Sequence, residues 1–164
     1  MVIDEAYIDF ADVPSAVGLI KKYDNLLVVR TLSKSHALAG LRVGFAIGDE
    51  RLINKLKVYK DCFNSYPLGM PAQKIAARAI KKQPKVKEII NTRQWLKGQI
   101  KCLDSQANFV FWEVDDSKTM YEHLLASKIL VRYWEKFPNH LRVSIGKQEE
   151  MEVFICTAKQ MRPK

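Results

Sequence analysis

The feature that most constrains the fold is a pair of short apolar runs that enclose a polar segment. Residues 26–30 (LLVVR) and 43–47 (VGFAI) have the composition of buried strands. Ser33 and Lys34 lie between them, and Arg42 comes just before the second run. Lysine and arginine are almost never fully buried without a partner, and an unpaired buried ammonium group is strongly destabilising. The segment is therefore either a solvated loop or the binding site of an anionic, electrophilic ligand.

Strands and helices alternate along the rest of the chain. The pattern predicts strands at residues 2–4, 108–114, 129–134 and 140–146, and helices at residues 15–23, 49–63, 72–102 (broken near Pro84), 118–128 and from Gln148 onward. Ser15 is the expected cap of the first helix. Gly69, between Pro67 and Pro71, marks the expected boundary between two lobes. The predicted fold class is α/β in the first part of the chain and α+β in the second.

Composition and cysteine usage narrow the class of protein. Apolar residues make up 48% of the 164 residues and charged residues 27%, which is typical of globular proteins. No apolar run approaches the ~20 residues that a membrane span needs, so we expect no membrane contact. The three cysteines, Cys62, Cys102 and Cys156, have the spacing of neither a disulfide framework nor a zinc site. We therefore expect free thiols, a cytoplasmic location and no metal.

The net charge of +9 raises the question of a nucleic-acid partner. The basic residues cluster only in residues 81–87 (KKQPKVK), and no helix-turn-helix, RNA-recognition or basic-zipper signature is present. We therefore expect no nucleic-acid partner. The excess of positive charge is better explained if the chain is part of a longer protein whose acidic portion is not included, and the strand at the very start of the chain favours the same interpretation.

Five polar residues are expected to converge above one end of the first sheet. Asp4 and Tyr7 follow a predicted strand, and Ser33, Lys34 and Arg42 follow or precede the next two. Together they match the demands of pyridoxal phosphate. The amine of Lys34 would form a Schiff base with the aldehyde, and Asp4 would hold the proton of the pyridinium ring. Tyr7 would bond the ring hydroxyl, while Ser33 and Arg42 would hold the phosphate.

Several segments resemble those of a known family. Residues 2–7 (VIDEAY) and 31–45 (TLSKSHALAGLRVGF) look like the fold-type I pyridoxal-phosphate-dependent aminotransferases, and residues 140–154 (HLRVSIGKQEEMEVF) favour the histidinol-phosphate branch. The resemblance spans nearly the whole chain. It implies that residues 1–66 are the C-terminal part of the cofactor-binding large domain, with part of its sheet. Residues 67–164 would be the linking helix and the small C-terminal domain.

The resemblance also implies an activity and further site residues. The activity is amino transfer between histidinol phosphate and 2-oxoglutarate in histidine biosynthesis, with amino-acid and keto-acid substrates and a homodimer at full length. Arg142 looks like the arginine that binds the substrate α-carboxylate, and Arg132 like one that binds the substrate phosphate. Strand alternation alone allows a solvent-facing position for either arginine. His36 is expected to be a packing or turn residue, because Lys34 itself can move the proton.

The family's N-terminal half is missing from this sequence, and with it the glycine-rich phosphate loop and the aromatic residue that stacks on the ring. The isolated chain is therefore expected to be inactive. Two alternatives stay open at this point. One is a fragment of a sister enzyme, such as an aromatic aminotransferase or a threonine-phosphate decarboxylase. The other is a short non-catalytic chain that acts in dimerisation or regulation.

Overall fold

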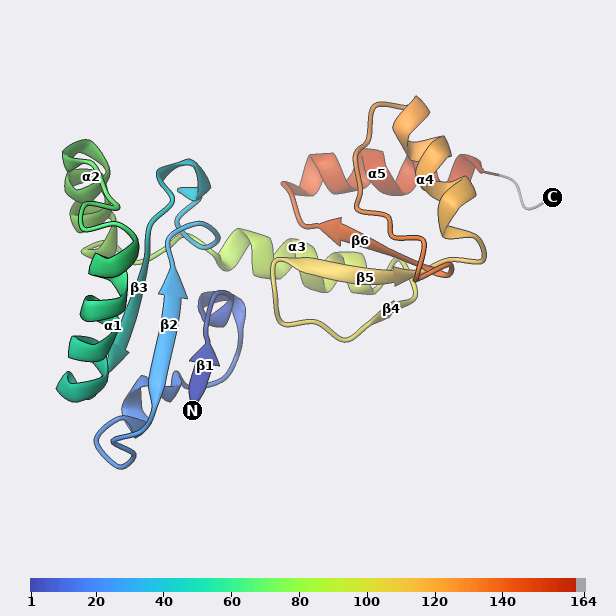
Figure 1. The fold of residues 1–164 in the computed structure, drawn as a ribbon. Helices are drawn as coiled ribbons and strands as arrows, with labels where there is room; N and C mark the ends of the chain where they lie inside the picture. The colour runs from blue at the N-terminus through green and yellow to red at the C-terminus, as the bar shows by residue number, and fades with distance from the viewer. Residues whose placement is uncertain (162–164) are drawn as a thin grey trace. The chain divides into compact units, whose positions relative to one another are not determined.

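The computed structural model describes residues 1–161, and the chain divides into two compact units, Met1–Lys85 and Val86–Lys164 (Figure 1). Each unit has its own three-stranded sheet. The predicted fold class, α/β followed by α+β, is confirmed. The domain boundary expected near Pro67 concerns the domains of the whole protein and stays a prediction.

The sheet of the first unit has the order β1–β2–β3. Strand β1 (Val2–Asp4) runs parallel to β2 (Leu27–Thr31), with Asp4 opposite Val29. Strand β3 (Gly44–Gly48) runs antiparallel to β2. The carboxyl ends of β1 and β2 and the amino end of β3 therefore meet at one end of the sheet, which we call the upper end.

Two helices follow the sheet, α1 (Glu50–Phe63) and α2 (Met70–Ile80). The Asp49 carboxylate caps α1 by accepting a hydrogen bond from the backbone N–H of Arg51 at 2.9 Å. The Arg51 guanidinium also bonds this carboxylate and lowers the pKa of Asp49 below its usual range. Pro71 lies in the first turn of α2, where its missing N–H leaves no helical hydrogen bond unmade.

A small core forms where the segment between β2 and β3 packs against α2. Leu32, Val43 and Ala76 are buried there. Leu38, Leu41 and other apolar residues pack around them. The conformation of residues 32–43 is therefore stabilised by apolar burial at its two ends. The expected short helix after Ser15 is a 3₁₀ helix at Ala16–Leu19, and the Ser15 hydroxyl caps it as predicted by accepting from the N–H of Val17.

The second unit contains an antiparallel sheet of β4 (Cys102–Leu103), β5 (Phe109–Glu113) and β6 (His140–Ser144), in that order. Phe111 lies opposite Arg142 in the register. Side chains on a strand point alternately to the two faces. One face of this sheet therefore carries Phe109, Phe111, His140, Arg142 and Ser144, and the other carries Val110, Trp112, Leu141 and Val143.

Three helices supply the rest of the second unit: α3 (Lys87–Lys97), α4 (Ser117–Ala126) and α5 (Gln148–Gln160). The predicted break near Pro84 is confirmed, because α2 ends before it and α3 begins after it. Asp116 caps α4, with its carboxylate accepting from two backbone N–H groups. Leucine, methionine and phenylalanine side chains of the three helices bury the apolar face of the sheet in one core. On the other face, Phe111 packs on the rings of Trp134, Phe137 and His140, and Arg142 and Ser144 lie beside it.

Phe154 of α5 anchors this core. Its side chain is 1% exposed and packs edge to face on Trp112, with ring centroids 5.3 Å apart. Phe154→Ala is therefore expected to lower the free energy of unfolding of the second unit by about 3–5 kcal/mol. The three tryptophans of the chain all lie in this unit, so urea unfolding followed by tryptophan fluorescence measures the loss. Val153→Ala, at a 60% exposed neighbour, is the matched control, and an equal loss in both variants would contradict the assigned core.

The strand predicted over residues 129–134 is wrong. Arg132 makes a single bridge with Arg142, with backbone N–H to O distances of 3.0 Å in both directions, and no further pairing follows. The chain turns at once, since the N–H of Phe137 bonds the carbonyl of Trp134 and a proline follows. The β-branched signal arises from Val131, whose side chain is buried in the core without a strand around it.

No helix among residues 1–161 is long and apolar enough to cross a membrane. Cys62, Cys102 and Cys156 are all free thiols.

Candidate active site

The topology brings the five candidate residues of the first unit to the upper end of its sheet. Asp4 ends β1, Ser33 and Lys34 follow β2, and Arg42 precedes β3. Tyr7 lies in the turn after β1. The carboxyl ends of parallel strands are the usual place for ligand-binding side chains in α/β sheets. The shared position is thus a consequence of strand direction, and the role of each residue stays a prediction.

Lys34 and Tyr7 come close to each other across this end of the sheet. The Lys34 Nζ lies 5.6 Å from the centroid of the Tyr7 ring, within the range of a cation–π contact. The Lys34 side chain is exposed, and no ion pair within residues 1–161 includes it. The amine is therefore accessible to a ligand at the upper end of the sheet.

Asp4, Ser33 and Arg42 have local backbone or hydroxyl partners. Oδ1 of Asp4 accepts from the N–H of Ala6 at 2.9 Å, and the carboxylate is exposed. The Ser33 hydroxyl lies 2.9 Å from Oγ1 of Thr31. Arg42 is also exposed, because a 3₁₀ turn directs the side chains of its apolar neighbours to the core.

The backbone of Arg42 is in the left-handed region, with φ 55°, and its Nη1 donates to the carbonyl of Ala39 at 3.1 Å. Left-handed backbone is unfavourable for a residue with a Cβ and often occurs at functional sites. The guanidinium retains further N–H donors for an anion, because it has five in a planar fork.

Sequence reasoning missed an acidic and basic network beside these residues. The Glu5 carboxylate, whose side chain is 4% exposed, accepts from Nε of Arg30 at 3.1 Å and from Oγ of Ser15 at 2.7 Å. Arg30 also lies 3.7 Å from the Asp9 carboxylate, which accepts a hydrogen bond from the Ser35 hydroxyl. A cavity of about 250 Å³ adjoins the network. The position of Arg30 at the end of a buried strand was the available signal, since a cation there needs a partner.

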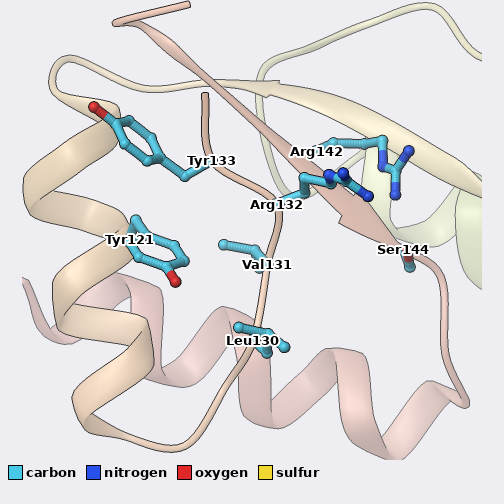
Figure 2. A pocket seen from close by; sticks show the side chains of 7 residues that line it. All are labelled: Tyr121, Leu130, Val131, Arg132, Tyr133, Arg142 and Ser144. Atoms are coloured by element: carbon cyan, nitrogen blue, oxygen red, sulfur yellow. The ribbon is translucent and has the colours of Figure 1, made fainter. Parts of the chain in front are cut away.

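A second group of candidate residues lies in the second unit. Arg132 and Arg142, joined by their backbone bridge, line an open cleft of about 460 Å³ (Figure 2). The other lining residues are Tyr121, Leu130, Val131, Tyr133 and Ser144. Tyr121 and Tyr133 stack with ring centroids 5.5 Å apart. The cleft thus combines two cations with aromatic and apolar walls, and Arg142 and Ser144 contribute to it from the sheet face opposite the core.

Aromatic rings hold the two guanidinium groups. The Arg142 Cζ lies 5.2 Å from the centroid of the Phe109 ring and 5.7 Å from that of Trp134, and the Arg132 Cζ lies 5.4 Å from Trp134. The Arg142 Nε is buried and has no hydrogen-bond partner among residues 1–161. Stacking orients a guanidinium while leaving its N–H edge for an anion. Arg132 is the more exposed of the two.

Comparison with known proteins identifies the family. The family described as aminotransferase class I and II matches residues 1–156. The chain therefore belongs to this family, which confirms the predicted resemblance. The histidinol-phosphate aminotransferase of Clostridium botulinum (strain 657 / Type Ba4) is 42% identical over 98% of this chain and 49% of its own length. That of Brachyspira hyodysenteriae is 45% identical over 94% of this chain and 48% of its own length.

The fold agrees with this assignment. The crystal structure of the histidinol-phosphate aminotransferase from Clostridium acetobutylicum superposes with a TM-score of 0.82 at 25% identity, over 97% of this chain and 53% of that chain. The chain spans about half the length of the curated relatives it matches.

Proposed function

We propose that the chain is part of a pyridoxal-phosphate-dependent aminotransferase that exchanges an amino group between histidinol phosphate and 2-oxoglutarate in histidine biosynthesis. The observation that carries the proposal is the exposed Lys34 amine, which lies over Tyr7 with no ion pair in residues 1–161. The curated relatives, named for this activity, support the choice of substrate. In this proposal residues 1–66 belong to the cofactor-binding large domain and residues 67–164 to the small domain.

The residues at the upper end of the first sheet fit this cofactor by their chemistry. Pyridoxal phosphate supplies an aldehyde for an amine and a protonated ring that accepts electrons. Lys34 offers an amine that pairs with no carboxylate of residues 1–161, and Asp4 offers an exposed carboxylate for the ring nitrogen. The Tyr7 phenol is a donor for the ring hydroxyl. Ser33 and Arg42 offer a hydroxyl and a guanidinium for the phosphate.

The cleft of the second unit fits the substrate anions. The Arg142 guanidinium is stacked on Phe109 and lines the cleft, where its N–H groups would bind a planar carboxylate in forked geometry. The exposed Arg132 suits the substrate phosphate, which carries more charge and stays partly solvated. We therefore assign the α-carboxylate to Arg142 and the phosphate to Arg132.

Each residue then has a defined task. The Lys34 amine would take the proton from the substrate α-carbon and then give it up again, as a general base and then a general acid. Asp4 keeps a proton on the ring nitrogen, because a carboxylate stabilises the cationic form of a nearby base. Arg142 binds the α-carboxylate of glutamate, and Arg132 binds the phosphate of histidinol phosphate, an amino alcohol ester that has no carboxylate.

We further propose that the full-length protein is a cytoplasmic homodimer. Three free thiols support a reducing compartment. Large apolar side chains on and after α1 are exposed, and they support burial by further protein: Val58, Tyr59, Phe63, Tyr66 and Met70.

A chimera tests the proposed function. The chain is joined to the N-terminal half of the Clostridium botulinum relative, in place of that protein's own C-terminal half. With pyridoxal phosphate, we expect the chimera to transfer the amino group of glutamate to the keto counterpart of histidinol phosphate. A folded, cofactor-loaded chimera that transfers amino groups from neither substrate would contradict the proposed function.

The isolated chain is expected to bind pyridoxal phosphate weakly. Hydrogen bonds to charged groups contribute roughly 1.5–3 kcal/mol each. Three contacts that the family's N-terminal half supplies, at about 2 kcal/mol each, correspond to about four orders of magnitude in Kd. A titration of the isolated chain and the chimera, followed by visible absorbance, measures the difference. Tight binding with turnover by the isolated chain would show that these residues suffice without a second half.

A further inference from the structure

Lys34 lies between two serines whose side chains are both anchored. On one side, the N–H of Ser33 donates to Oγ1 of Thr31 at 3.1 Å, and the two hydroxyls lie 2.9 Å apart. On the other side, the Ser35 hydroxyl donates to the Asp9 carboxylate. The segment that carries the amine is therefore tied to strand β2 before Lys34 and to the turn after β1 beyond it.

Asp9 is in turn connected to a buried anchor. Its Oδ1 lies 3.7 Å from Nη2 of Arg30, whose Nε donates to Glu5 at 3.1 Å. Glu5 is the most enclosed member, because its carboxylate also accepts from the Ser15 hydroxyl and from the N–H of Ala16 at 2.6 Å. These bonds connect the segment after β1 to the segment after β2.

The segment that follows β2 and carries Lys34 has no regular secondary structure to hold it, so side-chain bonds are needed to fix its position. Its backbone departs from regular structure, and Ala37 adopts a left-handed conformation with φ 54°, which is unfavourable for a residue with a Cβ. Within residues 1–161, the Lys34 side chain makes a cation–π contact with Tyr7 and takes part in no ion pair. Tyr7 lies between Glu5 and Asp9 in sequence, so the same network holds its backbone beside the segment that carries Lys34.

We propose that Asp9 is a positioning residue for Lys34. Through Ser35 it holds the Lys34 segment against the turn that carries Tyr7, so that Nζ keeps its place over the ring when its charge changes. That Asp9 positions Lys34 is argued from the hydrogen bonds and ion pairs of the network alone. That this positioning matters for catalysis rests on the proposed function.

Asp9 and Glu5 differ in what their removal does. Glu5 is 4% exposed at the side chain and has three kinds of donor, so its loss leaves Arg30 without its nearest carboxylate partner and disturbs the unit. The Asp9 side chain is 27% exposed, and its distance to Arg30 is longer. Asp9→Ala therefore releases the Lys34 segment while the Glu5 anchor stays in place.

The test uses the 164-residue chain with its lysines reductively ¹³C-dimethylated, a change that retains their charge. We expect the Lys34 methyl signal to be shifted by the ring current of Tyr7, and we assign it by its loss in Lys34→Arg. Asp9→Ala and Ser35→Ala should each move this signal toward the position of a solvated lysine. Ser35→Thr, which retains the hydroxyl, should restore the original shift.

Asp24→Ala is the matched control, since Asp24 is an exposed aspartate of the same unit that pairs with Arg51 and not with the Lys34 segment. Its Lys34 signal should stay where it is in the unmodified sequence. If Asp9→Ala fails to fold, Ser35→Ala still tests the proposal, because it removes the same hydrogen bond and leaves Asp9 in place. An unchanged Lys34 signal in folded Ser35→Ala and Asp9→Ala would overturn the proposal.

A second readout separates positioning from the proposed function. In the chimera, the rate at which borohydride fixes pyridoxal phosphate on Lys34 should fall about tenfold in Asp9→Ala, as expected for one charge-assisted hydrogen bond. If Lys34 of the unmodified chimera is not labelled faster than other lysines, the proposed function fails, and the methyl signal still decides the positioning. If labelling is fast and equal in both proteins, the positioning proposal is wrong.

Discussion

Lys34→Ala is expected to abolish amino transfer in the chimera, with a loss of at least about 10⁴ in rate, because one side chain supplies both the reactive amine and the proton transfer. The free energy of unfolding should change by less than about 0.5 kcal/mol, because the Lys34 side chain is exposed and takes part in no ion pair of residues 1–161. Transamination kinetics and thermal unfolding of the same samples measure the two effects.

A lysine in a similar setting provides the control. Lys22 is also exposed, and its Nζ lies 5.3 Å from the Tyr23 ring centroid, but it is not at the upper end of the sheet. Lys22→Ala should keep full activity. More than a trace of activity in Lys34→Ala without added amine would show that Lys34 is misassigned.

Arg142→Lys and Arg132→Lys are expected to have different substrate profiles. Arg142→Lys should weaken glutamate, by roughly 10- to 100-fold in kcat/KM, because an ammonium group can neither form the fork nor stack on Phe109. Histidinol phosphate has no α-carboxylate and should be affected less. Arg132→Lys should weaken only the phosphorylated substrate. Steady-state kinetics of both half-reactions in the chimera measure this.

Arg78→Lys, at an exposed position of α2, should leave both substrates unaffected and is the control for the Arg-to-Lys change. Equal losses on the two substrates in Arg132→Lys would contradict the division of tasks between the two arginines.

The sequence predicted most elements because strong local signals and tertiary packing agree in them. β2 and β5 are apolar runs bounded by polar residues, and α1 has helical spacing behind an aspartate cap. The prediction failed at residues 129–134, where burial of Val131 produces the composition of a strand without the pairing. It also missed β4, since a two-residue strand has too few positions for alternation to be detected.

The candidate site was predictable where it depends on strand order. Lys34 and Tyr7 follow neighbouring parallel strands, and their contact at the upper end of the sheet results from that arrangement. The network of Glu5, Arg30 and Asp9 was not predictable, because it depends on the register that places Asp4 opposite Val29. Strand alternation also left open which face Arg142 occupies, and the pairing of β6 with β5 resolves it.

Peptide mapping of the borohydride-reduced chimera tests the central claim most directly. The chimera is loaded with pyridoxal phosphate at equal molar ratio, reduced, digested and analysed by mass spectrometry. The account predicts one stable cofactor adduct, on the peptide that contains Lys34. An adduct confined to other lysines, such as Lys81 and Lys82 at the cavity beside the Glu5 network, with Lys34 unmodified, would contradict it.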